Sequence, residues 1–250
     1  MTLLPPQDPI HWLFALALNA LLIALAQRAP LLTPSGWVHA GILGTVLWGS
    51  LGWRGWLAVV AYLVMGSLVT RLGLRRKQER GLAEGRGGRR GPENVWGSAL
   101  VGAVLALIAT HAPSRWLEPL LLGFAASFSA KLADTFGSEI GKRWGRHTVL
   151  ITTFQAAPAG TEGAVSLEGT AASLLGGLLM ALVMLAVGLI HRPATVVMVA
   201  AVGLLATLAE SVLGATLQRR LKWLSNEMVN GLQTLLAALL ALTLAHQGLA

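Results

Sequence analysis

The 250-residue chain has no cysteine and few charged side chains. The lack of cysteine excludes disulfide bonds, thiolate metal sites and a cysteine nucleophile. Charged residues make up 12% of the chain, whereas a soluble domain usually carries about 25%. Apolar residues, in contrast, make up 54%. This composition excludes an ordinary soluble domain and indicates a helical membrane protein.

The apolar residues fall in long runs, several of which reach or approach the roughly 17–25 residues that cross a bilayer as a helix. The runs predict eight segments, at 10–27, 36–51, 55–71, 95–112, 116–132, 167–190, 194–217 and 227–247. The predicted fold class is therefore all-α: a polytopic integral membrane helical bundle of about eight transmembrane helices, with 1–250 as a single membrane domain. The first run follows no basic leader and has no convincing cleavage site, so we expect it to be retained as a helix.

The basic residues test this count. If the segments alternate across the membrane, sixteen of the 19 Lys and Arg residues fall on one side: Arg28, Arg71, Arg75, Arg76, Lys77, Arg80, Arg86, Arg89, Arg90, Lys131, Lys142, Arg143, Arg146, Arg219, Arg220 and Lys222. The other side receives Arg54, Arg115 and Arg192. By the positive-inside rule, both termini lie on the non-cytoplasmic side, and cytoplasmic loops are expected at 72–94 and 132–166. Topology and anionic lipid explain the net charge of +8 better than nucleic acid does, because no recognition module is visible.

The stretch ADTFGSEIG places four oxygen-bearing side chains after an apolar run: Asp134, Thr135, Ser138 and Glu139. Charges near membrane depth are costly and are rarely kept without a partner. A continuous helix would separate Asp134 from Glu139 by about 140°, whereas a break near Gly137 would bring them together. Because Mg²⁺ prefers carboxylates and substrate phosphates, the pattern favours a magnesium site. The alternative is a capped helix start with exposed acids.

The stretch PAGTEGAVSLEGTAAS, at 158–173, is a glycine-rich loop that runs into an apolar helix. Free N–H groups at a helix N-terminus suit a phosphate. The stretch is not a Walker A motif, because it has no Gly-Lys-Ser/Thr. A flexible loop that ends in a helix N-cap explains the same residues without a ligand.

The stretch AESVLGATLQRR places Glu210, Gly214 and Gln218 on one face of a helix. A glutamate inside a membrane helix is a functional hypothesis by default, and an interhelical hydrogen bond is the alternative. Residues 208–211 (LAES) echo 132–135 (LADT). Two such places would converge on one site in a fold with internal repeats, although four positions are too few to establish a duplication.

Three asparagines stand at predicted helix starts on the same side. Helix capping accounts for Asn94 and Asn226, and it accounts less well for Asn230, which lies further into its helix. The basic loop that precedes Asn94 offers cations that would neutralise phosphates, together with Lys142: Lys77, Arg86, Arg89 and Arg90. Ordinary positive-inside charge is the alternative for each of them.

Taken in order, ADTFGSEIG, PAGTEGAVSLEGT, ESVLGATLQ and NEMVN resemble the transmembrane protein 19 family, from about Gly36 to the C-terminus. This polytopic family, formerly of unknown function, includes the plant and cyanobacterial phytyl-phosphate kinases and is similar in organisation to phytol and dolichol kinases. The resemblance implies a membrane kinase of tocopherol biosynthesis that converts an isoprenoid monophosphate, such as phytyl phosphate, to the diphosphate. It implies Mg²⁺ as cofactor and CTP or ATP as phosphate donor, with CTP favoured.

The resemblance also implies roles for single residues. The catalytic group comprises Asp134, Glu139, Lys77 and Arg90. The metal ligands are Asp134, Glu139 and Glu210. The substrate- and nucleotide-binding residues are Thr135, Ser138, Gly160, Thr161, Gly163, Ser166, Gly169, Ser211, Gln218, Asn94, Asn226 and Asn230. The chain departs from the family pattern at three positions: Glu210 stands where aspartate is usual, Ala164 where glycine is usual, and Glu162 where a small polar residue is usual.

The implied partners are a prenyl phosphate lipid, a nucleoside triphosphate and membrane lipids, and no nucleic acid. A transporter of an anionic or lipid-linked substrate is one alternative, and a nucleotidyl transferase that makes a CDP-lipid is another. The motifs all fall on one side, which disfavours a transport path. The sequence leaves open the prenyl chain, the oligomeric state, and the choice between a bacterial plasma membrane and a photosynthetic or organelle membrane.

Overall fold

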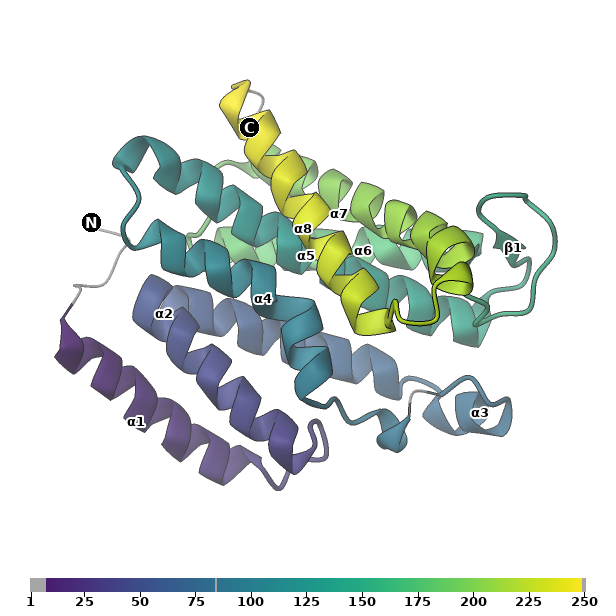
Figure 1. The fold of residues 1–250 in the computed structure, drawn as a ribbon, viewed down its shortest axis with the longest axis horizontal. Coiled ribbons are helices and arrows are strands. Elements are labelled where there is room, and N and C mark those ends of the chain that lie inside the picture. Colours follow the sequence, from purple (N-terminus) through teal and green to yellow (C-terminus); the bar gives the residue numbers. More distant parts are fainter. Residues whose placement is uncertain (1–7, 84, 249–250) are drawn as a thin grey trace.

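A computed structural model describes residues 8–83 and 85–248. These residues form eight α-helices (Figure 1): α1 (Pro9–Ala26), α2 (Pro34–Arg71), α3 (Leu74–Glu79), α4 (Pro92–Ala109), α5 (Ser114–Trp144), α6 (Leu167–Ala186), α7 (Pro193–Leu213) and α8 (Asn226–His246). Short turns, η1 (Arg86–Gly88) and the π-helical η2 (Gly214–Gln218), follow α3 and α7. The two-residue strands β1 (Val149–Leu150) and β2 (Ala164–Val165) pair antiparallel. The all-α prediction is confirmed.

Helix α2 contains two of the predicted segments, folded back on each other at Gly52 (Figure 1). Gly52 has φ 65° and ψ −159°, which only glycine adopts without strain. Both far ends of the hairpin meet Arg90. The amide of Thr33, just before α2, donates to the Arg90 carbonyl at 3.0 Å, and the Arg90 guanidinium lies against Gly66 in the second limb. The two limbs therefore run antiparallel, as expected if the predicted segments 36–51 and 55–71 cross the membrane in opposite directions.

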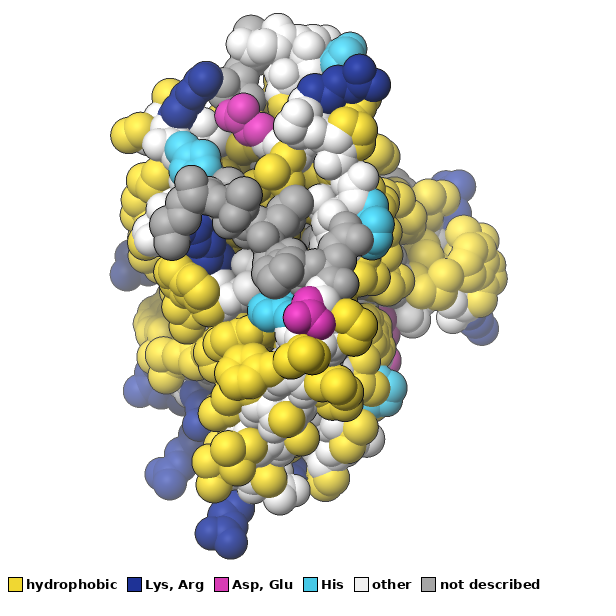
Figure 2. Space-filling model, turned by 90° about the vertical axis from the view of Figure 1, so that its left-hand side faces the viewer, with side chains coloured by type: hydrophobic (Ala, Val, Ile, Leu, Met, Phe, Trp, Pro, Cys, Tyr) yellow, Lys and Arg dark blue, Asp and Glu magenta, His cyan; other side chains and the backbone are white. Residues whose placement is uncertain are grey.

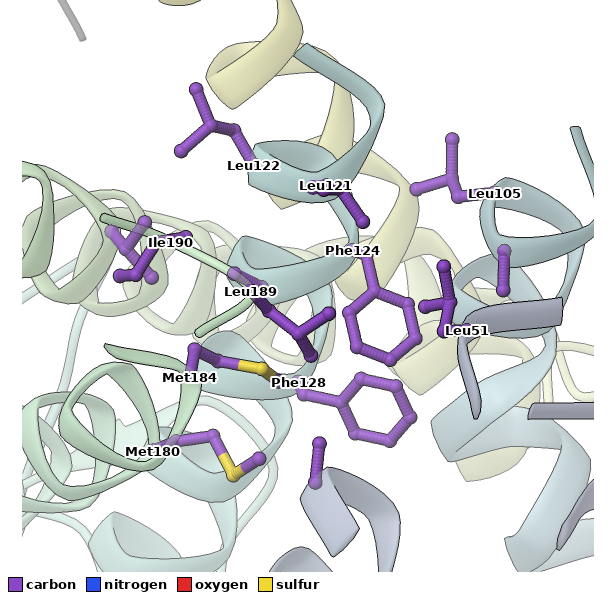
Figure 3. Packing of buried hydrophobic residues seen from close by; sticks show 14 of the residues in the cluster. Leu51, Leu105, Leu121, Leu122, Phe124, Phe128, Met180, Met184, Leu189 and Ile190 are labelled. Carbon is purple, nitrogen blue, oxygen red and sulfur yellow. The ribbon is translucent and has the colours of Figure 1, made fainter. Parts of the chain in front are cut away.

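Helix α5 occupies the centre of the bundle, where it packs against α2, α4, α6, α7 and α8. Every residue from 120 to 133 is buried. Its Phe124 and Phe128 pack with Met180 and Met184 of α6 in the main apolar core (Figure 3). This helix therefore sets the position of every side chain that follows on its second half.

Helix α5 continues through ADTFGSEIG without a break, so the expected loop at 132–166 is wrong over its first part and begins at Gly145. Gly137 is helical and allows close contact with α6. A Cβ added at Gly137 would lie 3.1 Å from the carbonyl oxygen of Gly169 and would overlap the Ser173 side chain. A glycine costs a helix about 1 kcal/mol relative to alanine, and the close packing of small residues between membrane helices offsets that cost.

The connections alternate between the two ends of the bundle (Figure 1). The loops at 72–91, 145–166 and 219–225 share one end with α3. At the other end, Arg54 beside the α2 turn donates to the carbonyl of Gly188 at 3.3 Å. The first turn of α1 and the last turn of α8 also lie at that other end. This is the alternation that the basic residues require, and the assignment of the loop end to the cytoplasm stays a prediction.

The outer surface carries large apolar side chains, as a lipid-facing surface does. Helix α1 exposes Leu13 and Leu25 at 64% and 69%. Apolar side chains cover much of the left-hand side of the molecule (Figure 2). Within the described residues, six helices are long and apolar enough to cross a membrane, α2 counting as one. The protein is a multi-pass integral membrane protein.

Candidate functional site

A cavity of about 200 Å³ lies at the loop end of the bundle. Its walls come from the first turns of α4, α6 and α8, the second half of α5, the last turns of α7, and the loop at 159–166. Fourteen of the seventeen predicted site residues line it: Arg90, Asn94, Asp134, Thr135, Ser138, Gly160, Thr161, Gly163, Ser166, Gly169, Glu210, Ser211, Asn226 and Asn230. Segments far apart in the sequence thus contribute to one polar cavity.

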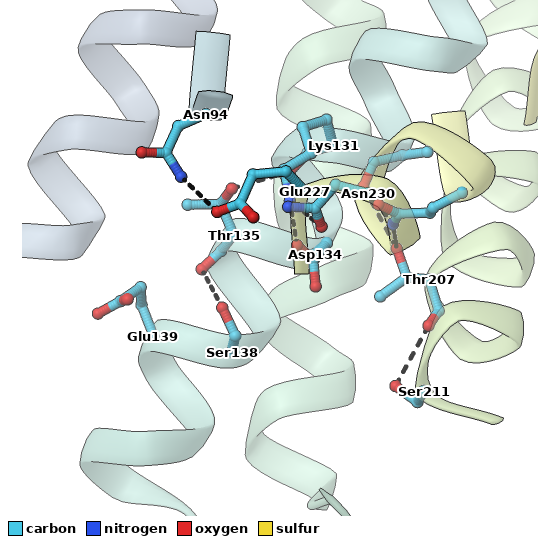
Figure 4. Close-up of polar contacts among 12 residues, drawn as sticks. Asn94, Lys131, Asp134, Thr135, Ser138, Glu139, Thr207, Ser211, Glu227 and Asn230 are labelled. Carbon is cyan, nitrogen blue, oxygen red and sulfur yellow. Dashed lines mark hydrogen bonds and ion pairs between the residues drawn. The ribbon is translucent and has the colours of Figure 1, made fainter. Parts of the chain in front are cut away.

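Three predicted residues do not line the cavity: Lys77, Glu139 and Gln218. Lys77 forms an ion pair with Glu139, and both side chains are buried, at 1% and 2% exposure. The Lys77 Nζ also donates to the carbonyl of Thr70 at 2.7 Å. The expected pairing of Asp134 with Glu139 at one metal is therefore wrong, because the unbroken helix directs the two carboxylates to different sides (Figure 4).

Asp134 faces the cavity and forms an ion pair with Lys131, one turn earlier on α5. Lys131 is 5% exposed, and its Nζ also donates to Asn230 Oδ1 on α8 at 2.9 Å (Figure 4). An isolated buried charge would be costly. The lysine, the aspartate and the asparagine therefore depend on one another across two helices.

Three of the hydroxyl groups that line the cavity donate hydrogen bonds to backbone carbonyls of their own helices. Thr135 donates to the Lys131 carbonyl at 2.9 Å, and Ser211 donates to the Thr207 carbonyl at 3.2 Å. Ser138 donates to the Thr135 carbonyl at 3.3 Å. Each hydroxyl oxygen keeps acceptor capacity toward the cavity.

Two asparagines at the helix starts differ from each other. Asn94 is the third residue of α4 and takes part in its capping box, because its Oδ1 accepts from the amide of the N-cap residue Gly91 at 2.9 Å. Its Nδ2 donates to Glu227 Oε1 at 3.3 Å. Asn226 is not the cap of α8. Ser225 takes that place, accepting from the amide of Met228 at 3.3 Å. Capping therefore accounts for Asn94 and leaves Asn226 at the cavity wall.

The glycine-rich loop forms one wall of the cavity. Ser166 is the N-cap of α6 and accepts from the amide of Gly169 at 3.1 Å. Gly163 has φ +75°, and a Cβ there would overlap Ala215 of η2. The loop is thus seated on the end of α7 by a residue that has to be glycine. The N-cap that the sequence predicted at the start of α6 is therefore present, and Ser166 also lines the cavity.

Glu210 and Ser211 line the cavity from α7, opposite Asp134 on α5. The two short echoes LADT and LAES therefore do meet at one place. Gln218 lies one π-helical turn further on, with its Oε1 buried and without a partner among the residues described. π-helical turns concentrate at functional sites, yet this one supports the loop and leaves Gln218 outside the cavity wall.

Sequence reasoning missed several lining residues. Lys131 was counted only as a loop charge, although a lysine at the end of a buried run, three residues before an aspartate, could have signalled it. Tyr62, the chain's single tyrosine, accepts from Arg90 Nη1 at 2.9 Å. Glu162 and Thr207 also line the cavity. No motif near Tyr62 indicates a site, whereas Thr207 directly precedes the LAES stretch at 208–211.

Charge around the cavity is mixed. Lys142 lines the outer part and lies 4.0 Å from Glu139 Oε1. Glu162 is exposed at the rim, where partial loss of hydration raises the pKa of its carboxyl, nearby Lys142 opposes the rise and Asp134 adds to it. Two expected phosphate contacts lie away from the cavity wall: Arg86 pairs with Glu93, and Arg89 is exposed beside it.

The chain is similar over most of its length to one family and to several known proteins. The family described as "Integral membrane protein DUF92" matches residues 17–238. An uncharacterized membrane protein of Synechocystis sp. is 52% identical over 233 residues, which cover 92% of this chain and 90% of the relative. "Protein VTE6, chloroplastic" of Arabidopsis thaliana is 41% identical over 239 residues, which cover 92% of this chain and 71% of the relative.

A more distant relative is an uncharacterized membrane protein of Methanocaldococcus jannaschii, 29% identical over 237 residues, which cover 93% of this chain and 95% of the relative. No solved structure matches the chain. The family match spans most of the sequence and includes every motif from which the resemblance was drawn. The chain therefore belongs to the DUF92 family of integral membrane proteins.

Proposed function

We propose that this protein is a membrane kinase that transfers a phosphoryl group from a nucleoside triphosphate, CTP favoured, to an isoprenoid monophosphate such as phytyl phosphate. The observation that carries the proposal is the cavity at the loop end, which combines carboxylates, cations and a glycine-rich helix start. The resemblance of the motifs to phytyl-phosphate kinases supports the choice of substrate class. The position at one end of a membrane bundle suits a lipid acceptor and a water-soluble donor.

The reaction needs no strong base. An oxygen of the acceptor phosphate forms a bond to the γ-phosphorus while the bond to the β,γ-bridging oxygen breaks. The electron pair leaves with the nucleoside diphosphate. A phosphate monoester has its second pKa near about 6, so the attacking oxygen is already ionised at neutral pH. This agrees with the absence of histidine from the lining in the described part of the chain. Catalysis then rests on positioning and charge neutralisation.

The donor set fits a magnesium ion shared with phosphates. Such ions commonly take one or two carboxylates together with substrate oxygens and water. Asp134 and Glu210 both line the cavity and would hold the ion, although Asp134 also pairs with Lys131. Glu139 pairs with Lys77 and does not line the cavity. Across residues 8–83 and 85–248, no three acidic or histidine side chains group closely enough to hold a metal without a ligand. Bound Mg²⁺ would neutralise charge on the transferring phosphates.

The cavity volume points to phosphates as its contents. Pockets for drug-sized molecules measure about 300–1,000 Å³, and this cavity measures about 200 Å³. The nucleoside and the prenyl chain would then lie outside it, on the water side and the membrane side. Lys142 and the amide groups at the start of α6 would face the phosphates of the nucleotide.

The test is direct transfer by the purified protein in detergent, with phytyl monophosphate, Mg²⁺ and either CTP or ATP. Mass spectrometry of the lipid should show a gain of one phosphoryl group. Asp134→Asn should lower the rate by about 100-fold or more. Glu168→Gln, which changes a carboxylate of the first α6 turn outside the cavity, should retain activity.

Two outcomes would contradict the kinase. A nucleotidyl adduct on the lipid would indicate the transferase instead. No product from several prenyl phosphates, given correctly folded wild-type protein, would favour the transporter. Transport would then be tested in proteoliposomes with the same lipid phosphates.

A further inference from the structure

Lys131 lies at the deepest point of the cavity on α5, its membrane-side end, where the cavity meets the buried core in the middle of the bundle. On α5 the lining begins at Lys131 and ends at Lys142, a separation of roughly 16 Å along a helix. The residues that precede Lys131 are buried and mostly apolar, and they include Phe124 and Phe128 in the main core. Lys142 lies toward the loops, near Glu162. The cavity thus has one lysine at its apolar end and another at its outer end.

The ammonium of Lys131 has a free donor. A lysine offers three N–H donors. One goes to Asp134 and one to Asn230 Oδ1 at 2.9 Å. In the described part of the chain the third donor has no acceptor, although Lys131 is 5% exposed and lines the cavity. A buried cation with a free donor beside a cavity is suited to an anionic oxygen inside it.

Asp134 and Asn230 hold this ammonium in place from two helices. The aspartate lies on α5 and the asparagine on α8, so the lysine cannot swing away without losing one of them. Next to Asn230 on the α8 face, Gln233 donates to Thr207 Oγ1 at 3.0 Å and to the Ala130 carbonyl at 3.1 Å. These bonds join α5, α7 and α8 immediately beneath the cavity. These residues form the floor of the cavity, and their hydrogen bonds hold it in place before any ligand binds.

The depth of Lys131 decides which phosphate it meets. A lipid phosphate has to keep its hydrocarbon chain in the apolar phase, so its headgroup enters from the membrane side. A nucleotide is fully water-soluble and approaches from the loops. The phosphate of a membrane-embedded lipid can therefore reach a cation that borders the core, whereas a nucleotide that reached it would have to bury its nucleoside.

We propose that Lys131 binds the phosphate of the lipid acceptor at the membrane-side end of the cavity, and that Lys142 binds nucleotide phosphate at its outer end. This assignment rests on the proposed kinase function and divides its site into two parts. Lys131 is then a substrate-binding residue, oriented by Asp134 and Asn230.

The first test separates the two substrates kinetically. Lys131→Met should raise the KM for phytyl phosphate by about tenfold or more, because a charge-assisted hydrogen bond is lost. It should leave the KM for CTP within about twofold. Lys142→Met, the matched control, should do the reverse. Lys131→Arg should recover part of the loss, since it keeps the charge. Equal changes in both KM values for Lys131→Met would indicate a structural role and overturn the assignment.

The second test measures binding without turnover. Phytyl phosphate, added without nucleotide, should raise the thermal unfolding midpoint of the wild type, and phytol, which lacks the phosphate, should raise it less. The double variant Lys131→Met/Asp134→Asn keeps the floor electrically balanced and should lose the difference between the two lipids. If it keeps the difference, or if the wild type shows none, the assignment is wrong. A phosphate-dependent shift in a protein that transfers no phosphoryl group would contradict the kinase and leave the lipid-phosphate site standing.

Discussion

Lys77 and Glu139 form a buried ion pair that fastens the basic loop to the central helix α5. Lys77 stands on the short helix α3, and its Nζ also binds the last turns of α2 through the Thr70 carbonyl. Because neither side chain lines the cavity, the pair holds the loop in place and offers no charge to a ligand. The same loop ends at Arg90, which does line the cavity.

Breaking this pair should destabilise the protein. Lys77→Met removes the ammonium that neutralises a buried carboxylate, and breaking one partner of a buried pair costs about 3–5 kcal/mol. The double variant Lys77→Met/Glu139→Gln removes the charge as well and should recover part of the loss. Unfolding in detergent, followed by tryptophan fluorescence, measures both. A double variant as unstable as the sum of its single variants would show that the two residues act independently.

Close packing of α5 on α6 should depend on Gly137. Gly137→Ala places a methyl group against Gly169 and Ser173, and overpacking of this kind typically costs about 1–3 kcal/mol. Gly231→Ala in α8 is the matched control, because a Cβ there meets nothing within 4 Å. That change should be neutral or should stabilise by about 0.5–1 kcal/mol. Thermal unfolding of the two variants decides, and equal midpoints would refute the close-packing role.

The seat of the glycine-rich loop should depend on Gly163. Gly163→Ala and Gly81→Ala both force alanine into a left-handed backbone, at φ +75° and +68°, which costs about 1–2 kcal/mol. Only Gly163→Ala also overlaps Ala215. We expect that variant alone to raise the KM for CTP, by about tenfold, because the loop moves off the cavity wall. CTP titrations measure this, and a similar rise for Gly81→Ala would point to backbone strain as the cause.

The stability of the protein should fall with rising pH through Glu162. Loss of hydration raises the pKa of this carboxyl above its ordinary value of 4.5. A group whose folded-state pKa is raised stabilises the protein below its unfolded pKa and loses that contribution as pH rises through the folded pKa. Glu162→Gln should therefore flatten the decline and gain relative to wild type above pH 4.5. Unfolding midpoints of wild type and variant, measured from below to above pH 4.5, give the difference, and Glu79→Gln, at an exposed position, is the control. A difference between variant and wild type that stays the same at every pH would contradict the prediction.

Metal dependence should report on Glu210. Glu210→Gln leaves Asp134 as the remaining lining carboxylate on the helices, so the Mg²⁺ concentration for half-maximal transfer should rise by about tenfold. Glu210→Asp, which introduces the residue usual in the family, should keep most of the activity. Magnesium titrations of phosphoryl transfer measure both. An unchanged magnesium requirement in Glu210→Gln would remove Glu210 from the metal site.

Much of the fold follows from local properties of the chain. Apolar runs of membrane-spanning length predicted all the long helices, and the alternation of basic loops predicted that α2 is two segments, which meet at Gly52, where the backbone is not helical. Both signals depend on residues close together in the sequence. Fourteen of the residues that the family resemblance implied for the site line the cavity, because the quoted motifs place them at helix ends that lie at one end of the bundle.

The sequence by itself determined a helical membrane bundle with polar groups gathered at one end, because hydrophobicity and charge act on each segment separately. Only the tertiary structure decided which of those groups share a cavity. Asp134 and Glu139 stand five residues apart on one helix, yet Asp134 pairs with Lys131, which also donates to Asn230, while Glu139 pairs with Lys77. Lys131 lies one turn before Asp134 on α5 and is held by Asn230 of α8, whereas Lys77 comes from α3. A buried charge takes its role from the neighbours that neutralise it.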